Sequence, residues 1–140
     1  MASAVRTYGL LGAASTITAV RDPDGVALID ERGPLTFGEL DARANAVANG
    51  WRRRGVRAGT GVAILCRNHR GFFDAVYAAG KCGARIILLN NGFGAEQLAD
   101  VASREGLDLL VHDEEFTALT DGIPPRFGRI LAAAPTRSTP

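Results

Sequence analysis

The sequence has little of the features that mark membrane, secreted or nucleic-acid-binding proteins. Its 140 residues include two cysteines, and the formal net charge is +1. No apolar run is long enough to cross a bilayer, so we expect no transmembrane segment. A charge so close to zero gives no argument for DNA, RNA or an anionic membrane as a partner. We therefore expect no nucleic-acid partner.

The scarcity of cysteine and histidine also excludes common site types. Cys66 and Cys82 lie in apolar runs, which predicts buried, reduced thiols and favours the cytoplasm over a secreted disulfide scaffold. His69 and His112 are too few and too scattered to complete a metal site with them. We expect no metal-binding residue.

The first twenty residues superficially resemble an export signal. They contain one Arg, a weakly apolar stretch and several small residues. Glycine, serine and threonine interrupt the apolar stretch. We therefore favour an opening amphipathic segment that lies on the domain, with export as the alternative.

The clearest local pattern is a helix over residues 37–54. Thr36 and Glu39 have the spacing of a capping box, and Gly55 ends the segment. Glu39 and Arg43 stand four residues apart, in the order that favours a surface ion pair. The apolar stripe predicted to face a core comprises Phe37, Leu40, Ala44, Val47, Ala48 and Trp51. Arg52–Arg54 are interpreted as a solvated helix end, with a phosphate or nucleic-acid patch as the alternative.

Strand-like and helix-like segments alternate beyond residue 25. Expected strands are Val26–Asp30, Leu35–Phe37, Gly61–Cys66, Arg85–Leu89, Leu107–Val111 and Arg129–Ala132. Expected helices, besides 37–54, are Phe72–Cys82 with Asn68 as N-cap, Ala95–Glu105 and a short one at Asp113–Leu119. This alternation predicts an α/β fold, a doubly wound parallel sheet with flanking helices. Residues 133–140 are expected to be an unstructured tail.

Two segments come close to known phosphate-binding motifs. Gly80-Lys81-Cys82 lacks the first Gly and the Ser/Thr of a P-loop, and it closes a helix instead of opening one, so we reject it. Gly92–Gln97 follows a strand and opens a helix, as in the dinucleotide fingerprint. Gln97 replaces the third glycine of that fingerprint, so an ordinary strand-to-helix turn is the preferred interpretation.

No arrangement of nucleophile, acid and base stands out. The chain has no GxSxG elbow. His69 follows a buried strand, where a catalytic base could sit, but no motif ties an acid to it, so a structural or solvated role is favoured. The run Asp113-Glu114-Glu115 is interpreted as the first turn of a helix, where carboxylates suit the helix dipole.

The order of the segments resembles the opening of the adenylate-forming (AMP-binding) superfamily. The matching elements are LTFGEL at Leu35–Leu40 with its helix, Gly55–Cys66, and Ala78–Ala84. The similarity is strongest to fatty acyl-CoA synthetases and covers about residues 21–132. Thr60, in place of the family's usual Asp, and Asn90-Asn91, in place of a Pro-containing turn, leave the subfamily open.

The resemblance implies the amino-terminal part of a fatty-acid–CoA ligase. Such an enzyme uses ATP and Mg²⁺ to convert a fatty acid or other carboxylic acid to an acyl-adenylate, then passes the acyl group to coenzyme A. The family's phosphate loop, Mg²⁺-binding Glu and catalytic Lys have no match here. We therefore carry over no catalytic, cofactor-binding or metal residue, and we expect this fragment to be inactive alone.

Two other functions stay open at this point. One is a non-catalytic binding or regulatory half-domain, in which an incomplete sheet self-associates or pairs with a synthetase. The other is a small Rossmann-type nucleotide-binding protein that uses Gly92 and Gly94. The expected organisation is an amino-terminal segment over 1–20, a partial domain over 21–132 and a linker or tail over 133–140.

Overall fold

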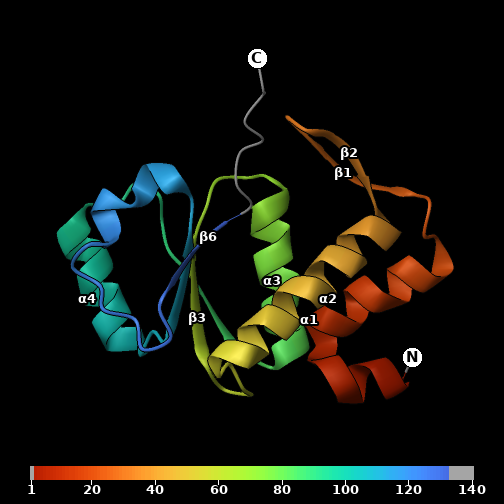
Figure 1. Cartoon of the computed structure of the whole chain (residues 1–140), viewed down its shortest axis with the longest axis horizontal. Helices are drawn as coiled ribbons and strands as arrows, with labels where there is room; N and C mark the ends of the chain where they lie inside the picture. The colour runs from red at the N-terminus through yellow and green to blue at the C-terminus, as the bar shows by residue number, and fades with distance from the viewer. Residues whose placement is uncertain (1, 133–140) are drawn as a thin grey trace.

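The computed structural model describes residues 2–132 and contains two sheets (Figure 1). The larger sheet has four parallel strands in the order β4-β3-β5-β6. Its strands are β3 (Gly61–Leu65), β4 (Arg85–Leu88), β5 (Leu109–His112) and β6 (Arg129–Leu131). The smaller sheet is an antiparallel hairpin of β1 (Val26–Asp30) and β2 (Gly33–Thr36).

Helices cover both faces of the parallel sheet (Figure 1). On one face lie α1 (Ala2–Arg21), α2 (Phe37–Arg54) and α3 (Arg70–Cys82), which pack against one another. On the other lie α4 (Ala95–Glu105) and the 3₁₀ turns η1 (Glu114–Phe116) and η2 (Ala118–Thr120). This is the doubly wound α/β architecture that the alternating pattern predicts.

The central strand β3 shows how the sequence specifies two cores. All five of its residues are buried. Val62 and Ile64 join the cluster formed with α2 and α3, whereas Ala63 and Leu65 join the cluster formed with α4. Successive side chains of a strand point to opposite faces, so a continuous apolar run fits a strand covered on both sides.

Helix α2 has the bounds that its sequence predicts, because local chemistry sets both ends. The Thr36 hydroxyl accepts the Glu39 N–H at 3.1 Å, and Glu39 Oε1 accepts the Thr36 N–H at 3.1 Å. These hydrogen bonds to Thr36 hold the pKa of the Glu39 carboxyl below its usual value. At the other end Gly55 has φ 110°, a left-handed conformation that favours glycine.

Several element predictions need correction. The N-cap of α3 is His69 and not Asn68, and the helix begins at Arg70. Phe37 opens α2 and does not belong to β2. The run Arg85–Leu89 also predicts a buried strand from its apolar residues, whereas β4 is an edge strand with Arg85 and Leu88 exposed.

The remaining differences are in the second half of the chain and at its end. The short helix expected at 113–119 is the pair of 3₁₀ turns η1 and η2. The tail expected at 133–140 lies outside the described residues. No helix in the described part of the chain combines the length and apolar character needed to cross a bilayer.

Candidate functional site

The carboxyl ends of β3 and β5 bring together charged side chains that are far apart in the sequence. His69 Nε2 lies 2.6 Å from Asp113 Oδ1, and the Arg67 N–H donates to Asp113 Oδ2 at 2.8 Å. The Arg67 guanidinium binds both carboxylate oxygens of Glu115 and lies 5.5 Å from the Phe116 ring centre. Ligands of doubly wound sheets bind at this edge, so it is the first place to test for chemistry.

Hydrogen bonding assigns the tautomer of the His69 ring. Its Nδ1 accepts the Gly71 N–H at 2.9 Å, so Nδ1 carries no proton. The proton therefore sits on Nε2 and is donated to Asp113. The histidine thus serves as the helix cap of α3, and the acid that the sequence left unidentified is Asp113, 44 residues away.

The same edge brings together three side chains of the types that ligate metals. Cys66 Sγ, a His69 ring nitrogen and an Asp113 carboxylate oxygen lie within 4.8 Å of one another. However, burial, together with the Asp113 charge, raises the pKa of the Cys66 thiol to about 12, and metals bind the thiolate. His69 Nε2 faces the site with its proton, where a ligand nitrogen needs a free lone pair.

The glycine-rich turn before α4 has its backbone donors already occupied. The Gly92 N–H donates to Asn90 Oδ1 at 2.8 Å, and the Gly94 N–H donates to the Gln97 side chain at 3.0 Å. The Phe93 N–H donates to the Asn90 carbonyl at 3.1 Å. A phosphate cradle needs such N–H groups free, so the geometry does not favour the Rossmann alternative that uses Gly92 and Gly94.

The segment Gly80–Cys82, which partly matches a P-loop, also has a structural role. Lys81 is 2% exposed, at the end of α3. Its Nζ lies 2.8 Å from Asp41 Oδ1 of α2 and 2.8 Å from the Thr16 hydroxyl of α1. The lysine therefore ties three helices together, which is consistent with the rejection of a P-loop at Gly80–Cys82.

Both cysteines are free and buried, as their apolar surroundings predict. The Cys66 Sγ lies 4.0 Å from the Val111 carbonyl, and the Cys82 Sγ lies 3.7 Å from the Ala48 carbonyl. Burial also raises the pKa of the Cys82 thiol. Burial outweighs the nearby Arg52 and Arg57 charges at Cys82, and neither thiol has the accessibility of a reactive cysteine.

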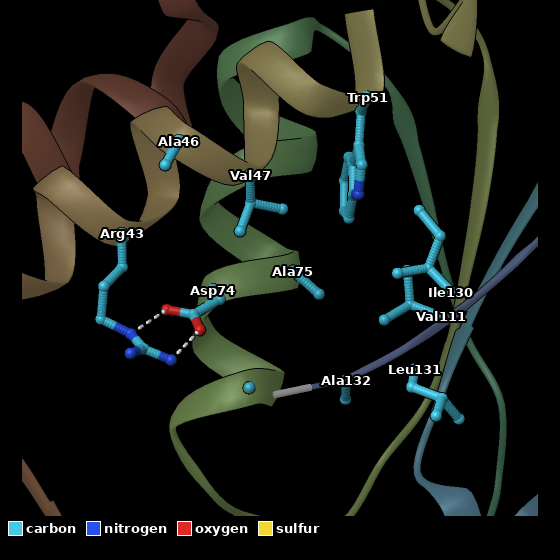
Figure 2. Close-up of a pocket in the computed structure, with 11 residues that line it drawn as sticks. Arg43, Ala46, Val47, Trp51, Asp74, Ala75, Val111, Ile130, Leu131 and Ala132 are labelled. Atoms are coloured by element: carbon cyan, nitrogen blue, oxygen red, sulfur yellow. Dashed lines mark hydrogen bonds and ion pairs between the residues drawn. The ribbon is translucent and has the colours of Figure 1, made fainter. Parts of the chain in front are cut away.

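An apolar pocket of about 330 Å³ lies between α2, α3 and β6 (Figure 2). Val47 and Trp51 of α2, Ala75 of α3 and Ile130 of β6 point into it. At its rim Arg43 Nε and Nη2 donate to the two carboxylate oxygens of Asp74 at 3.0 and 2.6 Å. Arg43 therefore pairs across helices, and the expected ion pair with Glu39 does not form because the Glu39 carboxylate serves in the capping box.

Several pairs between side chains that are far apart in the sequence were not predicted. Besides His69–Asp113 and Arg43–Asp74, the Arg70 guanidinium binds both oxygens of Asp30 at 2.7 and 2.9 Å. The Asp30–Arg70 pair joins the β1–β2 hairpin to the start of α3 and is nearly buried on both sides. Partners 31 to 44 residues apart leave no local spacing signal, so only the fold reveals them.

The sequence is similar to those of AMP-binding enzymes. A model of the AMP-binding enzyme family matches residues 16–134. A feruloyl-CoA synthase from Amycolatopsis is 33% identical over 111 residues, which cover 79% of this chain and 22% of that protein. A 2-succinylbenzoate–CoA ligase from Geobacillus kaustophilus is 30% identical over 118 residues, covering 84% of this chain and 23% of the ligase.

Solved structures agree with the family match. O-succinylbenzoate coenzyme A synthetase from Bacillus subtilis, in complex with AMP, is 27% identical with a TM-score of 0.76; 84% of this chain and 30% of that chain are covered. A Mycobacterium tuberculosis fatty acyl CoA synthetase superposes with a TM-score of 0.80 at 24% identity, over 87% of this chain and 26% of that one. The chain spans about a fifth of the length of the curated relatives named above.

Proposed function

This chain belongs to the AMP-binding enzyme family, and from that premise we propose that it forms the first part of the large amino-terminal domain of an ATP-dependent CoA ligase. In the proposed reaction a carboxylate oxygen of the acid attacks the α-phosphorus of ATP and releases pyrophosphate. The sulfur of coenzyme A then attacks the acyl carbon, and AMP leaves. The observation that carries the proposal is the family match over residues 16–134.

The proposed role of the described residues is to build the sheet and to position its carboxyl edge. The contacts of His69, Asp113, Arg67 and Glu115 hold the β3–α3 and β5–η1 connections together. The described residues do not fit ATP and Mg²⁺, because the Gly92 and Gly94 donors are occupied and the carboxylates at this edge are already paired. We propose that ATP, Mg²⁺ and coenzyme A bind to parts of the family domain that this chain does not span.

A fatty acid is the proposed substrate, within the wider class of carboxylic acids. This proposal is supported by the similarity of the chain to a long-chain fatty acid transport protein from Bos taurus, which is 34% identical over 113 residues. The free, buried thiols of Cys66 and Cys82 support a cytoplasmic location. We also propose the division into residues 1–20, 21–132 and 133–140.

A chimera tests the proposal directly. Residues 16–134 replace the equivalent segment of the Bacillus subtilis synthetase, and adenylate formation is followed by ATP–pyrophosphate exchange. We expect measurable exchange with succinylbenzoate, since the segment supplies scaffold and not substrate contacts. A chimera that folds, by thermal unfolding, but shows no exchange would contradict the scaffold role.

The same chimera carrying Leu110→Asp is the matched control. Leu110 is fully buried between the sheet and α4, so a carboxylate there is expected to abolish folding and exchange together. In the 140-residue chain alone we expect no binding of ATP by calorimetry. Binding that Gly94→Leu abolishes would support the Rossmann alternative instead.

A further inference from the structure

Helix α2 ends at the amino edge of the parallel sheet (Figure 1). Five arginines lie in and after its last turn and in the loop that precedes β6. We call this set the arginine face. It comprises Arg52, Arg53, Arg54, Arg57 and Arg126. Contacts connect its members: Arg57 Nη1 donates to the Arg52 carbonyl at 2.9 Å, and Arg54 Nη1 donates to the Phe127 carbonyl at 3.4 Å.

The arginine face differs from the other arginine clusters in its bonding. Among the described residues, none of its members lies within 4.0 Å of a carboxylate oxygen. Their donors go to carbonyl groups and to the Asn49 amide oxygen, and Arg53 is exposed with no such contact. The positive charge of this face is therefore left without a neutralising partner.

The charge of the whole chain conceals this feature. Outside the arginine face the chain has 15 Asp and Glu residues against 11 Lys and Arg residues. The near-zero net charge is thus the sum of five positive charges on the arginine face and a net negative charge on the rest of the chain. A segregated charge of this kind produces a local positive potential that a sequence total does not report.

An aromatic side chain lies among the arginines. The Arg126 guanidinium carbon lies 4.8 Å from the centre of the half-exposed Phe127 ring. Arginine heads on apolar stems next to an aromatic ring suit the boundary between water and lipid headgroups. Single-stranded nucleic acid needs a series of free stacking platforms, and this one ring is already covered by Arg126.

From this arrangement we propose that the arginine face docks the protein on an anionic phospholipid surface, as a peripheral contact. Phosphate headgroups supply the bidentate acceptors that guanidinium groups prefer. The contact places the amino edge of the sheet against the bilayer and leaves the carboxyl edge free. The proposal does not depend on the proposed ligase activity.

Vesicle sedimentation with the 140-residue chain tests this. We expect binding to vesicles that contain phosphatidylglycerol, no binding to pure phosphatidylcholine vesicles, and loss of binding at high salt. Arg53→Gln/Arg54→Gln should weaken binding by about 25-fold, at about fivefold per arginine near the surface. Arg21→Gln/Arg32→Gln, which removes the same charge from exposed positions outside the face, should leave binding within about twofold of wild type.

Fold retention is expected in the test variant, because both side chains are exposed and, among the described residues, their one side-chain hydrogen bond is the 3.4 Å bond from Arg54 to the Phe127 carbonyl. Circular dichroism checks this, and Arg53→Glu alone serves as a second variant that should weaken binding more than Arg53→Gln. Equal binding to both vesicle types, or an equal loss in the two double variants, would overturn the proposal. So would binding to DNA or to an acidic polypeptide without binding to anionic vesicles.

Discussion

The two edges of the parallel sheet use arginine in different ways. At the carboxyl edge Arg67 and Arg70 pair with carboxylates that come from distant segments. At the amino edge Arg52 and Arg85 donate to backbone carbonyls of Lys81 and Glu105, in the last turns of α3 and α4. Arg67 and Arg70 therefore join distant segments at the carboxyl edge, whereas Arg52 and Arg85 cap helix ends at the amino edge.

Helix direction explains this difference. Each helix of a doubly wound sheet runs antiparallel to its strands, so unsatisfied helix carbonyls gather at the amino edge. Those carbonyls accept guanidinium donors but neutralise only part of their charge. The carboxyl edge instead receives connections that need to be held together, and charge-assisted bidentate pairs provide this geometry.

The largest effect is expected from breaking the buried pair at the carboxyl edge. Asp30→Asn leaves the Arg70 charge, 9% exposed in its side chain, without its partner. We expect the free energy of unfolding to fall by about 3 kcal/mol, measured by urea denaturation. Asp24→Asn, at an exposed position, is the matched control, and an equal small effect in both variants would contradict this account.

The same pair makes the carboxyl edge sensitive to acid. The Arg70 guanidinium holds the pKa of the Asp30 carboxyl well below its usual value. The stabilisation is therefore fully present above about pH 4, the value of an unfolded Asp, and is lost as the pH falls toward the folded pKa. Unfolding measured from pH 5 down to pH 2 should show a shallower loss of stability in Asp30→Asn than in wild type.

The next largest loss of stability is expected at the amino edge, where Gly61 lies close to the backbone of Gly106. A Cβ on Gly61 would lie 2.5 Å from the Gly106 carbonyl oxygen, which belongs to backbone and cannot move aside cheaply. We expect Gly61→Ala to cost about 2 kcal/mol of unfolding free energy. Gly50→Ala in α2, where a Cβ meets nothing, should stabilise by about 0.5–1 kcal/mol, so the two variants should shift the thermal midpoint in opposite directions.

The smallest changes in unfolding free energy should distinguish the arginine–carbonyl bonds of the amino edge from the exposed arginine–carboxylate pair of the carboxyl edge. Arg52→Gln removes the donor to the Lys81 carbonyl and should cost about 0.5–1 kcal/mol. Arg67→Gln, in an exposed pair with Glu115, should cost less, and the difference from wild type should vanish in 1 M NaCl. If the Arg52→Gln effect also vanishes in salt, its bond to the carbonyl is not what stabilises this end.

Local chemistry determined much of the fold directly from sequence. The bounds of α2 follow from a capping box and a C-terminal glycine, groups within four residues of the helix ends they satisfy. The strand β3 follows from a short apolar run, and Ala95–Glu105 from its amphipathic period. In these segments the partners are neighbours in the chain, so spacing alone carries the information.

Tertiary structure decided what spacing does not encode. His69 is the N-cap of α3, and Asp113, which follows β5, positions its ring. Arg43 pairs with Asp74 because the Glu39 carboxylate is held by the cap. The edge position of β4 exposes side chains that composition alone would bury. The sequence by itself thus determined the family, the element order, the α/β class and the run of arginines at 52–57. The pairs between distant charged side chains, and the position of Arg126 beside that run, arise only when folding brings distant segments together.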